Sequence, residues 1–174
     1  LVAASLFFPT GEYDTATVNI PDRQIKVANL GKNRFAFDPV VAYTYLDPTT
    51  GREFSAVGGV TFSAENDATD YQTAPEAHLE LTAMQYLPNR LGLGLTGYAY
   101  KQLGDDNGAG ADAIRFATGQ DSLQAEVYGI GPLITYSTKV GDRSVSMKLK
   151  YLHEFSARKR FESDVVTASV NFSF

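Results

Sequence analysis

Ionisable side chains recur at every second position in several short segments of this sequence. In residues 144–155, Lys148, Lys150 and Glu154 share one parity, and the other parity carries Val, Met, Leu, Tyr and Phe. Alternate residues of a β-strand point to opposite faces. Each such segment therefore predicts a strand with one polar and one apolar face, and the polar face could line a watery passage. Three more ionisable residues follow the same pattern: Asp38, His78 and Glu80.

The two histidines, His78 and His153, are the first candidates for acid–base chemistry because imidazole titrates near neutral pH. A Ser/His/Asp hydrolase or acyltransferase needs a nucleophile beside the imidazole, and no motif indicates one. We therefore expect no enzyme activity and no cofactor. His78 has polar parity near a long loop, where it could line the mouth of a channel or be an ordinary interfacial residue.

The stretch 103–122 is rich in Gly and Asp and contains two weak motifs. Residues 108–113 resemble a dinucleotide loop, but they open no convincing helix and have no βαβ setting, so we expect no nucleotide there. Four residues could offer oxygen ligands to a divalent cation: Asp105, Asp106, Asn107 and Asp112. Their spacing matches no ligand loop, and we expect solvated charges instead.

A basic cluster lies in residues 157–161, which we expect to be a loop: Arg158, Lys159 and Arg160. These groups pair well with phosphate, so contact with lipopolysaccharide is one interpretation, and solvated loop tips are the other. The net charge of −5 and the pI near 5.0 argue against a nucleic-acid partner.

Eight segments with period-two alternation account for most of the chain: 1–8, 35–46, 53–64, 78–87, 91–102, 124–138, 144–155 and 164–174. The last is the clearest, with Val166, Ala168, Val170, Phe172 and Phe174 on one parity. Hydrophobic residues make up 44% of the chain, yet none of its apolar runs is long enough for a transmembrane helix. The chain has no cysteine, so disulfides and thiolate metal sites are excluded. We predict an all-β, antiparallel up-and-down transmembrane β-barrel, as one domain over residues 1–174.

The connections between these segments alternate between short and long. Short turns are expected near residues 47–51, 88–89 and 140–142, and long loops after Phe8, Ala64, Gln102 and Ser156. Bacterial outer-membrane barrels have short periplasmic turns and long outer loops. Placing Phe174 at the periplasm puts every short turn on that side. Aromatic residues also gather toward both ends of the segments, as interfacial girdles do, although aromatic filling of a sandwich core is the alternative.

Parity alone does not decide which face lies inside. In a lipocalin-like soluble barrel the interior is apolar, whereas in a membrane barrel the charged face must be the lumen, because charge at the lipid midplane costs about 2–4 kcal/mol. The loop lengths and aromatic positions favour the membrane version. The predicted lumen-lining residues are Asp38, Glu80, Tyr98, Tyr100, Lys148, Lys150 and Glu154.

Glycines on two of the expected strands bear on whether the lumen is open or filled by side chains. Four of them leave positions of the polar face without a side chain and indicate a partly hollow interior: Gly92, Gly94, Gly129 and Gly131. The alternative is that eight strands leave room only for side chains and the lumen is filled by paired charges.

A resemblance to a known family rests on short motifs spread over nearly the whole chain. They are Asn29-Leu30-Gly31 with Asn33, Phe37-Asp38-Pro39, Thr44-Tyr45-Leu46-Asp47-Pro48 with Gly51 and Glu53, Glu65-Asn66 with Thr69-Asp70-Tyr71, Gly97-Tyr98 with Tyr100 and Gln102, Gly131-Pro132, and Lys150-Tyr151 with Glu154-Phe155. Together they resemble the MetA-pathway of phenol degradation family of proteobacterial outer-membrane channels. The resemblance implies a monomeric barrel of about twelve strands that takes up small hydrophobic or aromatic compounds.

The chain supplies about eight strands and begins at Leu1 inside an apolar segment, without Met. We therefore expect it to be the carboxyl-terminal portion of such a barrel, although a smaller closed barrel or an open sheet are alternatives. The function hypothesis is a passive outer-membrane channel for small hydrophobic or aromatic solutes, in contact with outer-membrane lipid and lipopolysaccharide. The alternatives are a structural or adhesive barrel with a plugged lumen and a soluble ligand-binding barrel.

Overall fold

Strands dominate the computed structural model of this protein, which describes residues 1–14, 18–19, 24–25 and 29–173. Within these described ranges, eight strands form one sheet, two more form a separate short hairpin, and one helix lies between β7 and β8. Their bounds are β1 Val2–Phe7, β2 Val18–Asn19, β3 Gln24–Ile25, β4 Ala36–Asp47, β5 Arg52–Ser63, β6 Glu76–Tyr86, β7 Leu91–Gln102, α1 Ala109–Thr118, β8 Glu126–Val140, β9 Arg143–Arg158 and β10 Asp164–Ser173.

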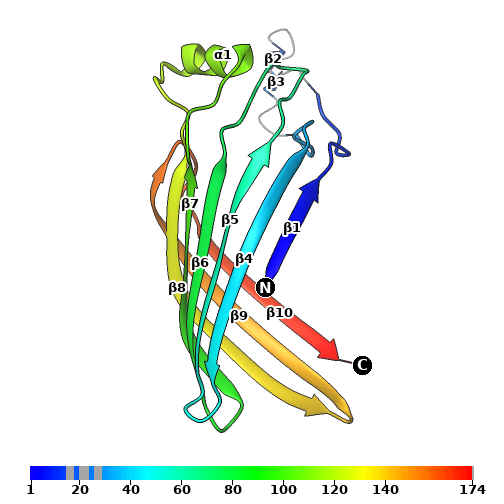
Figure 1. Cartoon of the computed structure of the whole chain (residues 1–174), viewed down its shortest axis with the longest axis vertical. Helices are drawn as coiled ribbons and strands as arrows, with labels where there is room; N and C mark the ends of the chain where they lie inside the picture. Colours follow the sequence, from blue (N-terminus) through cyan, green and yellow to red (C-terminus); the bar gives the residue numbers. More distant parts are fainter. Residues whose placement is uncertain (15–17, 20–23, 26–28, 174) are drawn as a thin grey trace.

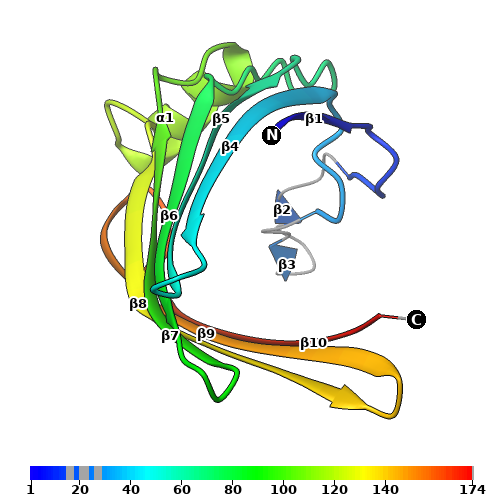
Figure 2. The same cartoon turned by 60° about the horizontal axis from the view of Figure 1, so that its bottom comes forward.

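The main sheet keeps the order β1–β4–β5–β6–β7–β8–β9–β10, and every neighbouring pair is antiparallel. Figures 1 and 2 show this sheet curled into a half-barrel with β1 and β10 at its edges. Sequential neighbours in a curled antiparallel sheet are what the sequence predicted, so the fold class is confirmed. Among the described residues, no helix is long and apolar enough to cross a membrane.

Two local expectations are wrong. Helix α1 forms in the stretch 103–122, where we expected no convincing helix. Alternate alanines favour a helix there, and Gly119 ends it in the left-handed conformation with φ 63°. Strand β9 also continues to Arg158, so the first part of the expected basic loop 157–161 belongs to the strand. The terminal aromatic residue of the predicted closing strand, Phe174, lies outside the described residues.

Short turns and long connections lie at opposite ends of the sheet. The turns from β4 to β5, β6 to β7 and β8 to β9 share one end, called here the turn end, and the longer connections share the other, called the loop end (Figure 1). In the first turn, Asp47 Oδ1 accepts the backbone N–H of Thr49 at 2.9 Å, and Gly51 takes the positive φ of 69° that the reversal requires. The predicted alternation of connection lengths is confirmed.

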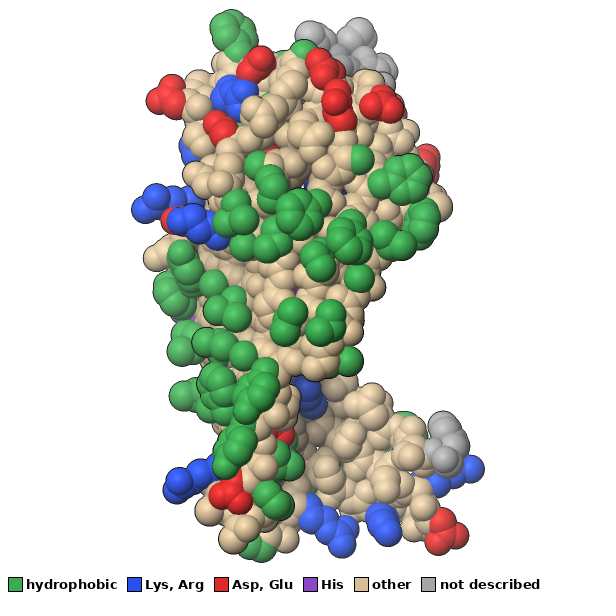
Figure 3. All heavy atoms as spheres, in the orientation of Figure 1, with side chains coloured by type: hydrophobic (Ala, Val, Ile, Leu, Met, Phe, Trp, Pro, Cys, Tyr) green, Lys and Arg blue, Asp and Glu red, His purple; other side chains and the backbone are tan. Residues whose placement is uncertain are grey.

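The apolar parity of the strands is the exposed one. Leu95, Ile130 and Phe172 are each more than half exposed, whereas Thr96 and Glu154 on the polar parity are buried. Figure 3 shows apolar side chains spread over the convex face between charged groups near both ends of the molecule. Side chains inside a curled sheet crowd together and those outside spread apart, so the polar face is the concave one. The soluble barrel with an apolar interior does not fit this arrangement.

The loop end is held by a network centred on Asp106, whose residue is only 5% exposed. Its carboxylate accepts hydrogen bonds from the backbone N–H of Ala74 at 3.0 Å, from Gln102 and from the Tyr71 hydroxyl. Arg115 of α1 donates to the Asp106 backbone carbonyl at 2.7 Å. The expectation of solvated charge is therefore wrong for Asp106, which ties the β5–β6 and β7–β8 connections together.

Replacing Asp106 should loosen the loop end without unfolding the sheet. Asp106→Ala leaves three donors without their acceptor, a loss of about 1–3 kcal/mol for a buried polar group, so amides of residues 71–74 should exchange roughly 10- to 100-fold faster. Hydrogen exchange read by mass spectrometry measures this. Asp121→Ala, an exposed acid in the same connection, is the control and should leave exchange unchanged. Equal exchange in both variants contradicts the role of Asp106.

Tyr71 makes the same network sensitive to alkali. Burial, and then the hydrogen bond to Asp106, raise the pKa of Tyr71 well above its usual value. The neutral phenol is favoured in the folded state, so its contribution to stability is complete below pH about 10 and is lost as pH rises toward the folded pKa. Thermal unfolding at pH 8 and pH 11 should show a larger loss for the wild type than for Tyr71→Phe. Tyr45→Phe, exposed on the convex face, should behave like the wild type.

Candidate functional site

A histidine and a carboxylate pair across the concave face with a strand between them. His78 on β6 approaches Asp38 on β4, with Nε2 and Oδ1 2.9 Å apart. Strand β5 separates the two, and its Gly59 stands directly beside His78 in the register. A Cβ at position 59 would lie 2.7 Å from the imidazole Nε2 and 2.7 Å from the backbone oxygen of Pro39. Glycine at 59 therefore provides the room for this pair.

The same arrangement recurs on the other half of the sheet. The Tyr98 hydroxyl on β7 donates to Glu154 on β9, and Gly129 of β8 is paired with both residues. A Cβ at position 129 would meet the Tyr98 ring at 2.4 Å. The aromatic ring thus lies over β8, and again a glycine on the middle strand allows it.

Glu154 is also the centre of contacts from the last connection. Its Oε2 accepts the backbone N–H of Ser163 at 2.8 Å and the Ser163 hydroxyl at 2.7 Å. The Arg160 guanidinium lies 4.0 Å from Glu154 Oε1 and stacks 5.0 Å over the ring of Tyr100. Because cations bind aromatic faces, Arg160 connects the β9–β10 connection to β7, and the Tyr100 hydroxyl donates in turn to Glu76.

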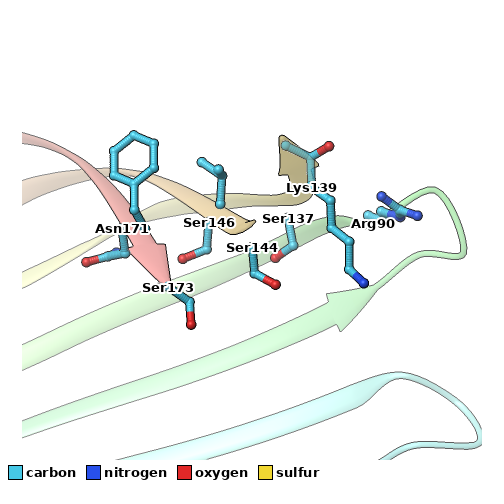
Figure 4. A pocket seen from close by; sticks show the side chains of 10 residues that line it. Arg90, Ser137, Lys139, Ser144, Ser146, Asn171 and Ser173 are labelled. Atoms are coloured by element: carbon cyan, nitrogen blue, oxygen red, sulfur yellow. The ribbon is translucent and has the colours of Figure 1, made fainter. Parts of the chain in front are cut away.

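The turn-end half of the concave face contains a polar hollow of about 290 Å³. Lys150 and Glu80 form an ion pair of 3.6 Å at its side. Lys148 lines the same hollow with hydroxyl groups from β4 to β8. A second polar depression of about 440 Å³ lies near the β8–β9 turn. Figure 4 shows its hydroxyl and amide groups on three neighbouring strands with two basic side chains beside them: Ser137, Ser144, Ser146, Asn171, Ser173, Lys139 and Arg90.

A larger hollow between described residues lies at the loop end, bounded by β1, the connection after it and β4 to β7. It measures about 640 Å³, and we call it the vestibule. Its wall combines apolar and ionisable side chains, namely Phe7, Phe8, Leu30, Arg34, Glu76, His78 and Tyr100. Such a mixed wall suits a ligand that has an apolar body and one polar group.

Every predicted lining residue lies on the concave, polar parity, and all except Lys148 take part in the contacts described above. Lining of a passage stays a prediction.

The hollow expected from glycines is wrong in part, because Cβ atoms at Gly92, Gly94 and Gly129 would collide with Tyr86, Met84 and Tyr98 side chains. Glu76 was missed, and Arg160 was predicted only as a lipopolysaccharide contact and not as a residue of the concave face. Glu76 shares the parity of His78 and Glu80, so the pattern contained it, but β6 begins two residues earlier than expected.

The basic cluster divides between the two faces. Arg160 points to the concave side, where it meets Tyr100 and Glu154. Arg158 pairs instead with Glu126, Nε to Oε1 3.1 Å, and its side chain is 76% exposed. Lys159 takes a positive φ of 55° at the start of the connection. Contact of these residues with lipopolysaccharide stays a prediction.

A curled antiparallel sheet with an exposed apolar convex face and a polar concave face is the arrangement of a β-barrel membrane protein. The model of the MetA-pathway of phenol degradation family matches residues 1–170 of the chain, which therefore belongs to this family. The resemblance seen in the sequence motifs is confirmed. No curated protein and no solved structure matches the chain. The family description associates the protein with phenol degradation.

Two adjacent glycines offer a matched test of the cross-strand pairs. Gly59→Ala places a methyl group against His78 and the Pro39 carbonyl and should destabilise the protein by about 1–3 kcal/mol, as overpacking does. A Cβ at Gly58 meets nothing closer than 3.6 Å, so Gly58→Ala should be neutral or stabilise by about 0.5–1 kcal/mol. Denaturant unfolding of both refolded variants in detergent measures the difference. Equal stabilities would mean that the His78–Asp38 pair does not depend on Gly59.

Proposed function

We propose that this protein is an outer-membrane channel for the passive uptake of small hydrophobic or aromatic molecules. The observation that carries the proposal is the vestibule, where aromatic and aliphatic side chains stand beside an imidazole, a guanidinium and a phenol. A phenol-like solute can place its ring against Phe7 and Phe8 and its hydroxyl against His78 or Tyr100. The family description supports aromatic compounds as the solute class.

From the vestibule the proposed path follows the polar concave face toward the turn end. Asp38, Tyr98 and Glu154 come first, and the hollow beside Lys148 and Lys150 follows. In this proposal the loop end faces the outside of the cell and the turn end faces the periplasm, as the connection lengths of such barrels suggest. Solutes pass by diffusion. The protein acts as a monomer, and the lining residues catalyse no reaction.

One observation favours a plugged barrel instead. The ring of Tyr98 and the imidazole of His78 lie across neighbouring strands and occupy concave space above Gly129 and Gly59. A small barrel filled in this way stabilises the membrane protein but transports nothing. The two functions differ in conductance, since a plugged barrel is electrically silent.

Electrical recording tests the channel directly. Protein purified from cell envelopes, after density-gradient fractionation has located it, is reconstituted in planar bilayers. We expect discrete conductance steps, and phenol added on the loop-end side should produce transient blocks. Absence of conductance from folded protein would contradict the channel proposal and favour the plugged barrel. Co-migration with the inner membrane in the gradient would contradict the outer-membrane location.

The vestibule is tested by the duration of those blocks. Phe8→Ala removes one aromatic contact, worth about 0.5–1.5 kcal/mol, so phenol blocks should shorten roughly two- to tenfold while the conductance remains. Phe172→Ala is the matched control because this ring is exposed on the convex face near the turn end. Equal shortening in both variants would show that phenol does not bind in the vestibule.

A further inference from the structure

The convex face contains an apolar depression of about 360 Å³ on β7. Its floor is Gly97 and Ala99, and larger side chains on the strands on either side form its rim: Leu79, Tyr128, Ile130 and Phe155. The register explains the shape, because the small residues of β7 pair with Leu79 and Leu81 on β6 and with Tyr128 and Ile130 on β8. A narrow apolar groove on a lipid-facing surface fits a hydrocarbon chain.

Three charged residues stand on the same face directly beyond this groove, toward the loop end. Lys101 follows Ala99 by two residues, Glu126 precedes Tyr128 by two, and both are paired in the register. Two residues of strand correspond to about 7 Å. Lys101 Nζ lies 3.6 Å from Glu126 Oε2, and Arg158 Nε lies 3.1 Å from Glu126 Oε1.

This cluster has one more positive than negative charge, and its cations are the accessible part. The Lys101 and Arg158 side chains are 53% and 76% exposed, whereas that of Glu126 is 16% exposed. The carboxylate pairs with both cations, and both cationic side chains stay largely exposed. A pair of cations that share one neighbourhood is well suited to a phosphate.

We propose that Lys101 and Arg158 bind a phosphate of an acylated, phosphorylated glycolipid of the outer leaflet, with one of its acyl chains in the Gly97–Ala99 groove. The proposal rests on the outer-membrane location and orientation given above, which put the loop end at the level of the outer-leaflet headgroups. It assigns the lipid contact to Lys101 and Arg158 on β7 and β9, and it leaves out Arg160, which faces the concave side. A second copy is disfavoured because a two-fold contact over the groove would bring two positively charged clusters into one interface.

The experiment measures binding of bis-phosphorylated, hexa-acylated lipid A to the purified protein in detergent by native mass spectrometry. Lys101→Ala with Arg158→Ala should weaken binding about 10- to 100-fold, as loss of charge-assisted bonds does. Ala99→Phe, which fills the groove, should weaken it about tenfold. The control, Arg90→Ala with Lys139→Ala, removes the same charges at the turn end and should bind like the wild type. Removing the phosphates from lipid A should weaken binding to the wild type to the level of the double variant.

Several results would overturn the proposal. They are equal affinity of the wild type and the Lys101/Arg158 double variant, equal affinity for phosphatidylglycerol and lipid A, or a dimer in sedimentation that Ala99→Phe abolishes. Circular dichroism checks that each variant is folded, and the charge variant tests the site even where Ala99→Phe does not fold. Conductance and lipid A binding of the wild type, measured side by side, separate the two proposals. Lipid binding of the wild type without conductance removes only the channel, and conductance of the wild type without lipid binding removes only the glycolipid site.

Discussion

Successive side chains of each strand point alternately to the convex and to the concave face of this sheet, and the two faces are different environments. A hydrocarbon environment on the convex side excludes charge, at about 2–4 kcal/mol for a basic residue at the midplane. Most ionisable residues of the central strands therefore face the concave side, where curvature brings them close together, and His153 on the convex parity of β9 has Asp164 as its partner. Crowded charges away from bulk water need partners, and the concave face supplies them as ion pairs and as hydrogen bonds from tyrosine to carboxylate.

Two of these pairs join strands that lie two apart in the sheet. His78 meets Asp38 across β5, and Tyr98 meets Glu154 across β8. Such contacts require an empty position on the middle strand, and glycine is the only residue that leaves one. Gly59 and Gly129 weaken their strands in isolation, but here each allows a contact that joins three strands. Gly129, one of the glycines that indicated a partly hollow lumen, thus allows a side chain to close part of it.

The strands and the side on which each predicted lining residue lies could be read from the sequence. Alternation with a period of two is a local signal. The face on which a residue such as Leu95 or Lys150 lies therefore follows from its own strand, whichever strands are its neighbours. Contacts between distant strands have no such signal, so the pairs His78–Asp38 and Tyr98–Glu154 were not predicted. Helix α1 was missed because ten residues in a Gly-rich stretch contain too few turns to show a helical period. Asp106 was misjudged because its burial depends on Ala74 and Tyr71, which come from another connection.

The cross-strand pairs also bear on the geometry of the sheet. Strands two apart in a flat sheet are separated by roughly 9.5 Å, measured along the backbone ladder. A side-chain hydrogen bond on the concave face connects the same two strands directly, and in a curved sheet this direct path is shorter than the path through the middle strand. The Asp38–His78 and Tyr98–Glu154 bonds therefore draw the concave side together on both halves of the sheet. The radius of the half-barrel is then set partly by the lengths of an imidazole and a phenol, and not by the hydrogen-bond ladder alone.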